Sequence, residues 1–109
     1  MSIALLYMHP LDTQSYTMDF ADDLPSSDSA LADINSGSQI NVTDSTGLTV
    51  TNTVIASKTR TSKTLIASIH GLTNGQDYEV QFWGQGATSG QRFVKTLAIR
   101  CRSNIQGAF

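Results

Sequence analysis

The stretch that decides the fold is HGLTNGQDYEVQFWGQG, residues 70–86. Its polar turn, Leu72 to Gly75, leads into Tyr78, Val80 and Phe82, which alternate with polar residues. A period of two predicts a strand with one apolar face. A tyrosine that starts a strand after a turn is typical of a tyrosine corner, whose hydroxyl binds backbone a few residues upstream. We therefore predict that Tyr78 is buried and that its hydroxyl binds backbone between Leu72 and Gly75.

Working outward, the composition also favours β-structure. The chain has 109 residues, the size of one domain, and contains 13 Ser and 13 Thr but only one Glu and three Lys. Helix surfaces prefer Glu and Lys, whereas Thr suits strands. The single Cys101 excludes an internal disulfide framework, so the chain needs no oxidising compartment.

Several function classes are disfavoured by charge and hydropathy. The net charge of −2 and the pI near 5.4 do not support nucleic-acid binding. No stretch approaches the ~20 apolar residues of a membrane-spanning helix, so no membrane partner is expected. No secretory signal is visible, and the glycosylation pattern NVT at residues 41–43 therefore carries no weight.

Alternation elsewhere predicts six or seven short strands, at the spacing of a β-sandwich. Residues 48–57 make the strongest strand by residue type, and residues 57–63 are expected to be a basic connector. In the last strand Leu97, Ile99 and Cys101 share a face, which predicts that Cys101 is buried and inert. The segment ALADI, residues 30–34, fits a strand or a helical turn. The other predicted strands include residues 16–20, 40–42, 65–70 and 77–83.

The charges are segregated along the chain. Residues 1–57 hold seven Asp and no Lys or Arg, whereas residues 58–109 hold all seven Lys and Arg. The two halves either neutralise each other across the sandwich or form two faces of opposite sign that suit head-to-tail contacts. The first interpretation is slightly favoured.

Both termini are predicted to be extensions of the domain, which spans residues 13–103. The N-terminal arm, residues 1–12, is apolar and uncharged from residue 3 to residue 8, and the C-terminal tail is residues 104–109. Pro10 would interrupt strand pairing where the arm enters a sheet, so we expect the arm to lie on a neighbouring subunit. Folding back as an edge strand is the alternative. The predicted contact residues are Ile3, Leu5, Leu6, Tyr7, Met8 and Phe109.

Leu72 to Phe82, LTNGQDYEVQF, resembles the segment that leads into the sixth strand of fibronectin type III and related immunoglobulin-like domains. The resemblance implies an all-β, immunoglobulin-like (fibronectin III-like) antiparallel β-sandwich of about seven strands. The chain departs from those families in two respects. Its single tryptophan, Trp83, lies on this strand rather than early in the chain, and the cysteine pair of antibody domains is absent.

A second resemblance covers nearly the whole chain and concerns small virion proteins of tailed bacteriophages. Their D-Y-x-x-D-[FW]-x-x-x-L element is matched by residues 15–20 and Leu24, with Ser15 in place of the first Asp. Their G-L-T-V and G-x-x-Y-x-V strands are matched by residues 47–50 and 75–80. The resemblance implies a structural subunit that decorates or cements the capsid, or belongs to the neck or tail. Its partners would be other copies and other virion proteins, after assembly in the bacterial cytoplasm.

No constellation in the sequence predicts catalysis, a cofactor or a metal site. A G-x-S-x-G elbow is absent, and the acidic loop from Asp19 to Asp28 lacks the glycine and glutamate of an EF-hand, so solvated acids are expected there. We therefore expect no enzyme. The alternative binding function is a carbohydrate-binding adhesion module, in which an exposed Trp83 beside Glu79 and Gln81 stacks on a surface glycan. Two other interpretations of Trp83 are favoured over glycan binding and equally with each other: the side chain folds over the sandwich edge, or it lies in a contact with another copy.

Overall fold

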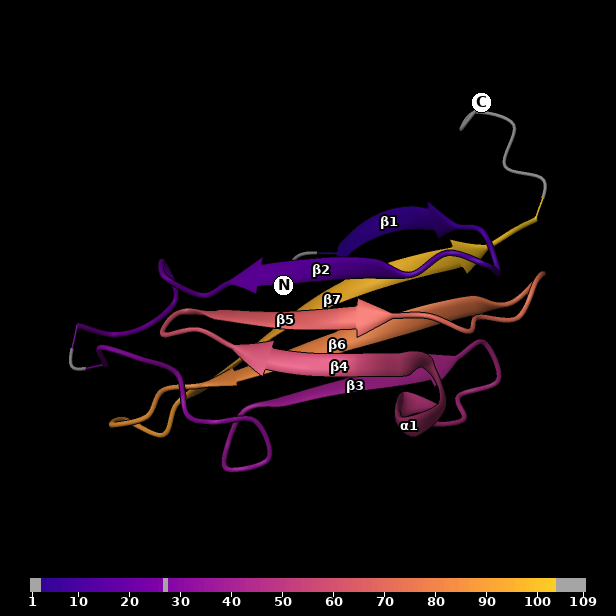
Figure 1. Ribbon diagram of the computed structural model, residues 1–109. Helices are drawn as coiled ribbons and strands as arrows, with labels where there is room; N and C mark the ends of the chain where they lie inside the picture. The colour runs from indigo at the N-terminus through magenta and orange to yellow at the C-terminus, as the bar shows by residue number, and fades with distance from the viewer. Residues whose placement is uncertain (1–2, 27, 104–109) are drawn as a thin grey trace.

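The computed structural model describes residues 3–26 and 28–103 and consists of two β-sheets packed face to face (Figure 1). One sheet has four strands in the order β1-β7-β6-β3, and the other has three in the order β2-β5-β4. The elements are β1 (Ile3–Met8), β2 (Gln14–Asp19), β3 (Gln39–Asp44), α1 (Thr51–Val54), β4 (Ile55–Arg60), β5 (Thr64–Ile69), β6 (Asp77–Gln85) and β7 (Arg92–Cys101). The predicted all-β sandwich is confirmed.

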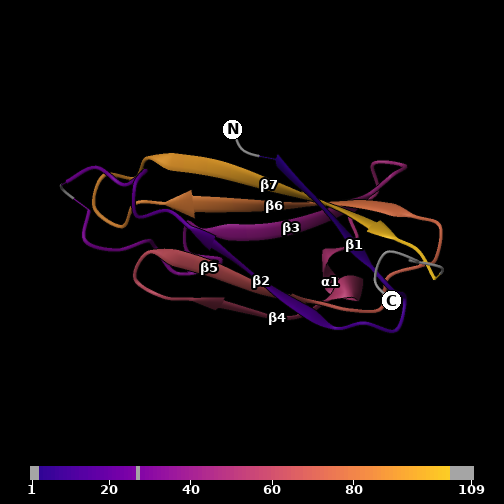
Figure 2. The same ribbon diagram turned by 90° about the horizontal axis from the view of Figure 1, so that it is seen from above.

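The core lies between the sheets, where alternate residues of the strands meet. The strands β5 and β6 each bury every second side chain, as a half-buried sheet requires, and β7 does so from Leu97 to Cys101. Figure 2 shows the two layers from above. Cys101 is fully buried on β7, as predicted, and burial raises the pKa of its thiol, which disfavours the reactive thiolate. The largest fully buried side chains are Phe20, Phe82, Met8 and Leu31.

The tyrosine corner is confirmed. Tyr78 begins the inward face of β6 and is 6% exposed. Its hydroxyl accepts a hydrogen bond of 2.9 Å from the backbone N–H of Thr73, inside the predicted turn. This bond joins the turn after β5 to the start of β6 and so fixes the crossing between the two sheets.

The prediction of a strand over residues 48–57 is wrong. The chain there forms one short helix, α1, and the strand β4 begins only at Ile55 and takes in most of the expected basic connector. The reason is the edge of β3. The Val50 N–H donates to the Val42 carbonyl at 2.8 Å, and the Val42 N–H donates to Thr51 Oγ1 at 2.9 Å. The segment before β4 therefore closes a sheet edge instead of adding a full strand.

The prediction that residues 1–12 form an arm on a neighbouring subunit is also wrong for the part that the structure describes. Residues 3–8 are β1, which pairs in parallel with β7, so the sandwich is not wholly antiparallel. Met8 is fully buried. Pro10 does not interfere, because it follows the last paired residue and lies in a turn closed by the Asp12 N–H to the His9 carbonyl. The C-terminal tail, with Phe109, lies outside the described residues.

Candidate functional site

Strand β1 lies at the edge of the four-stranded sheet (Figure 1). It carries an exposed apolar surface. Leu5 is 50% exposed, Leu6 36% and Tyr7 52%, although no residue of the strand is charged. Three large apolar side chains in a row on an edge strand are unusual, because such edges favour uncontrolled pairing with other chains. The β1 edge is therefore the first candidate for a contact with another molecule.

The exposed side chains occupy both faces of β1. Leu5 pairs with Ala98 and Tyr7 with Arg100, which places both on the outer face of the sheet. Leu6 pairs with Ile99, a core residue, and therefore points toward the sandwich interior. Leu6 stays partly exposed because no strand follows β1 at this edge in the described sheet.

The backbone at this edge is also available for pairing. The Met8 carbonyl accepts a hydrogen bond of 2.9 Å from the Arg102 N–H, so the backbone groups of Met8 face β7. Backbone groups alternate in direction along a strand, so those of Leu6 also face β7. Those of Leu5 and Tyr7 face away from it, and β7 is the one strand paired with β1 among the described residues.

The two edges of the three-stranded sheet are protected in ways that β1 is not. Strand β4 has a register shift between Ile55 and Ser57 and carries Lys58 and Arg60. Bulges and basic side chains both discourage added strands. Strand β2 exposes polar residues, Ser15, Thr17 and Asp19.

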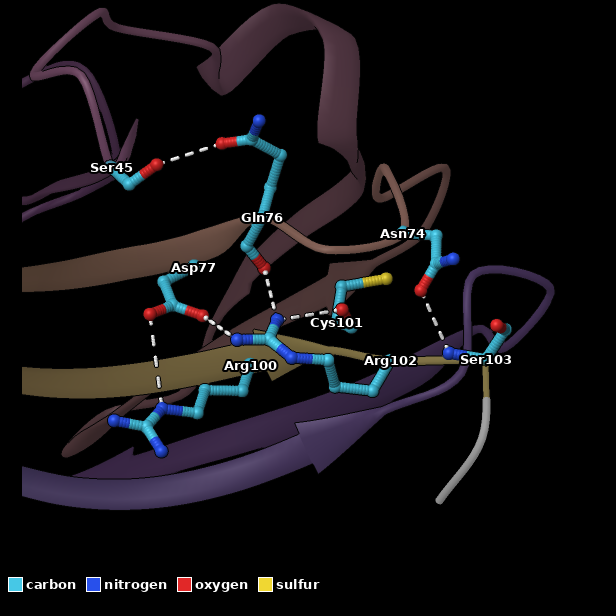
Figure 3. A network of polar contacts seen from close by, with 8 residues as sticks. All are labelled: Ser45, Asn74, Gln76, Asp77, Arg100, Cys101, Arg102 and Ser103. Carbon is cyan, nitrogen blue, oxygen red and sulfur yellow. Dashed lines mark hydrogen bonds and ion pairs between the residues drawn. The ribbon is translucent and has the colours of Figure 1, made fainter.

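A polar network fixes the end of the sheet beside β1 (Figure 3). The Arg102 guanidinium donates to the carbonyls of Gln76 and Cys101, at 3.3 and 2.9 Å, and to Asp77 Oδ1 at 2.9 Å. The Nε of Arg100 lies 3.8 Å from the other carboxylate oxygen of Asp77. The Arg100 charge next to Tyr7 therefore has a partner within its own chain.

Trp83 lies on the outer face of the same sheet, on β6, and is partly buried. Its ladder neighbours are Gln39 on β3 and Val94 on β7. The indole N–H donates to Gln81 Oε1 at 3.3 Å, and the Gln81 amide donates to Glu79 at 2.8 Å. Trp83 thus belongs to a row of polar side chains on an open sheet face.

The expectation that the loop acids are solvated is wrong for Asp28, which is 5% exposed. Its carboxylate accepts hydrogen bonds from the backbone N–H groups of Thr88 and Ser89, at 2.7 and 2.9 Å, and from the Ser89 hydroxyl. The Ser89 hydroxyl bond, aided by the backbone bonds, lowers the pKa of Asp28. Gly86 makes the approach possible, because a Cβ there would overlap the carboxylate. These hydrogen bonds hold the loop between β6 and β7 in place against Asp28.

Ion pairs between the two halves of the sequence favour neutralisation within the molecule. Arg60 pairs with Asp33, and Lys95 Nζ lies 2.9 Å from Asp23 Oδ2. Within residues 3–26 and 28–103, no group of three or more His, Cys, Asp or Glu side chains could hold a metal ion. In the same part of the chain no helix is long and apolar enough to cross a membrane.

The structure brings some of the predicted contact residues together and separates others. Leu5, Leu6 and Tyr7 line one edge, whereas Tyr78 and Met8 are buried and Trp83 lies on the sheet face. Ile3 belongs to β1, and the structure describes its backbone alone. Leu11, which is 87% exposed in the turn after β1, was not predicted, because the sequence offers only its apolar character as a signal.

Comparison with known proteins gives no significant match to a protein family, to a curated protein or to a solved structure.

Proposed function

We propose that this chain is an immunoglobulin-like sandwich that serves as a non-enzymatic structural subunit of a tailed-bacteriophage particle. It would decorate or cement the capsid, or form part of the neck or tail. The observation that carries the proposal is the β1 edge, where Leu5, Leu6 and Tyr7 are exposed on an uncharged strand. Burial of this edge in an assembly would remove apolar surface from water, which stabilises the assembly by about 25 cal/mol per Å² of buried apolar area.

The strand order supports the immunoglobulin-like assignment. The orders β2-β5-β4 and β3-β6-β7 correspond to strands B-E-D and C-F-G of immunoglobulin domains. The tyrosine corner at Tyr78 falls at the start of β6, the equivalent of strand F. The first strand differs from the constant-type arrangement, because β1 pairs with β7 rather than with β2.

The resemblance of residues 15–24, 47–50 and 75–80 to small phage virion proteins supports the particle as the location. The mechanism is physical: a compact domain presents a sheet edge, and neighbouring subunits bury it. The partners are other copies of the chain and other virion proteins.

The test is to locate the protein in particles. Particles are purified from cells that encode the chain, and an antibody against it is used for immuno-electron microscopy and for quantitative blotting. A fixed labelled position and a constant number of copies per particle are expected. Particles that lack the chain would refute the proposal.

A second candidate function, carbohydrate binding on the outer face of the four-stranded sheet, is supported by the row of polar side chains around Trp83. An indole ring flanked by Gln39, Gln81 and Glu79 offers a stacking surface and hydrogen-bonding groups, the combination that a sugar ring requires. A glycan array should give a titratable signal that Trp83→Ala abolishes and the exposed control Tyr7→Ala preserves. An array without a signal would contradict this candidate and leave the structural role unaffected.

A further inference from the structure

We propose that the partner at the β1 edge is a second copy of the chain, which pairs its own β1 antiparallel to the first across a two-fold axis at Leu6. This inference rests on the proposed function, since it names the partner of the same edge. It would join two four-stranded sheets into one continuous sheet of eight strands.

The backbone geometry selects the residues that would pair. Leu5 and Tyr7 direct their backbone N–H and C=O groups away from β7, as the bond from the Arg102 N–H to the Met8 carbonyl implies. In an antiparallel ladder, two outward-facing residues opposite each other exchange both of their hydrogen bonds. When Leu5 lies opposite Tyr7 of the second copy, the two-fold axis also places Tyr7 opposite Leu5 of the second copy. The backbone N–H and C=O groups of Leu5 and Tyr7 in both strands are then hydrogen-bonded.

The side chains select this register over its neighbours. When Leu5 faces Tyr7, Leu6 faces Leu6 of the second copy as a non-hydrogen-bonded pair, whose Cα atoms are about 4.5 Å apart. All three exposed apolar residues then gain an apolar partner, Leu5 with Tyr7 on the outer face and Leu6 with Leu6 on the inner face. A register centred on Leu5 instead sets Leu6 opposite Ala4, and one centred on Tyr7 sets Leu5 opposite His9.

Charge supports a second copy rather than a strand from a different protein. No residue of β1 is charged, so pairing with itself brings no like charges together. Arg100, which neighbours Tyr7 in the sheet, already pairs with Asp77 and so does not call for an acidic partner. Stable interfaces bury at least ~1,200 Å² of accessible surface, and a contact made by one strand of six residues should bury less than this. We therefore expect the dimer to be weak when it is free in solution. A particle that holds copies close together would supply the missing affinity as effective concentration.

The first experiment tests the register by disulfide formation under mild oxidation. Leu6→Cys should give a covalent dimer, because a Cα separation near 4.5 Å lies within the range of about 4.4–6.8 Å that disulfides span. Leu5→Cys alone and Tyr7→Cys alone should form no covalent dimer, whereas an equimolar mixture of these two should form the mixed disulfide-linked dimer. The unaltered chain is the control, since Cys101 is buried.

The second experiment measures association without a cross-link. Sedimentation of the full chain from about 1 μM to about 500 μM should show a concentration-dependent dimer. Leu5→Lys should abolish this dimer, because each lysine would lie opposite Tyr7 of the other copy and lose part of its hydration. Thr17→Lys, on the polar β2 edge, should leave the dimer unchanged.

Three results would overturn the inference. Leu5→Cys that cross-links to itself would show another register. A chain that stays monomeric at every concentration, with no cross-link from Leu6→Cys, would rule out the second copy as partner. A monomer that dimerises only after residues 104–109 are removed would show that the chain's own tail covers the edge.

The inference and the proposed function fail separately. Antibody labelling of particles by a chain that never self-associates would refute the dimer and keep the structural role. A cross-linked dimer that is absent from particles would do the reverse.

Discussion

The two edges of the four-stranded sheet differ in how far their backbone groups are hydrogen-bonded. At the β3 edge, Val50 and Thr51 bind the backbone of Val42, and α1 follows at the same side of the molecule (Figure 1). At the β1 edge, Leu5 and Tyr7 present free backbone groups and exposed side chains among the described residues. An edge that only had to be soluble would be closed as β3 is, or charged as β4 is. This contrast is the reason why we propose a partner for β1.

The largest effect should come from Met8→Ala, which tests whether the open edge still belongs to the core. Met8 is fully buried at the end of β1, and truncating such a residue lowers the free energy of unfolding by about 2–5 kcal/mol. Urea denaturation measures it, with Leu5→Ala as the exposed control, which should change stability by less than about 0.5 kcal/mol. Equal small effects for both would mean that β1 does not pack on the domain in solution.

Thr51→Val tests the closed edge. The Val42 N–H is buried and donates to Thr51 Oγ1, so removing the acceptor leaves an unsatisfied donor, which costs about 1–3 kcal/mol. The matched control is Thr53→Val, an exposed residue of the same helix, which should be nearly neutral. If Thr51→Val were as mild as its control, the β3 edge would be closed by something other than this bond.

Tyr78→Phe tests the tyrosine corner on β6, an interior strand of the four-stranded sheet. The Thr73 N–H would lose its acceptor, which should lower the free energy of unfolding by about 1 kcal/mol. Tyr7→Phe provides the comparison at the open edge, where Tyr7 is 52% exposed and its hydroxyl should contribute almost nothing to monomer stability. A larger loss from Tyr7→Phe in dilute solution would reverse the assignment of the two tyrosines.

The smallest stability effects are expected for lysine substitutions of two exposed leucines, Leu5 at the open β1 edge and Leu48 near the closed β3 edge. Leu5→Lys and Leu48→Lys, at positions 50% and 64% exposed, should each change monomer stability by less than about 0.5 kcal/mol. Light scattering at high concentration should nevertheless distinguish them, because only Leu5→Lys should abolish association. If Leu48→Lys abolished it as well, the contact would not be confined to β1.

Alternation in the sequence predicted β2, β3, β5, β6 and β7, because each has one face on the core and one on solvent. It failed over residues 48–57, where β-branched residue types suggested a strand but the unsatisfied backbone of Val42 determined the conformation. Residue type reports a preference for extended backbone, and it does not reveal which edge needs a hydrogen bond.

The candidate site was predictable in its residues but not in its geometry. An uncharged apolar run at residues 3–8 predicted a contact surface, yet period and composition do not reveal that β7 is its ladder partner. Asp28 was missed for a related reason. Its burial depends on the loop at residues 86–90, about 60 positions away, whose glycine admits the carboxylate. Contacts between distant segments leave no local signal.

The parallel pairing of β1 with β7 also constrains how the protein is made. The residue pairs run from Ile3 with Thr96 to Met8 with Cys101, so β1 cannot pair until β7 has been synthesised. Contacts between such distant positions form slowly, since a long loop must close before they stabilise anything. A nascent chain therefore carries this apolar strand unpaired until β7 has been added. Strands left exposed in this way are prone to aggregation, and a ribosome-associated chaperone that shields residues 3–8 should raise the yield of folded protein.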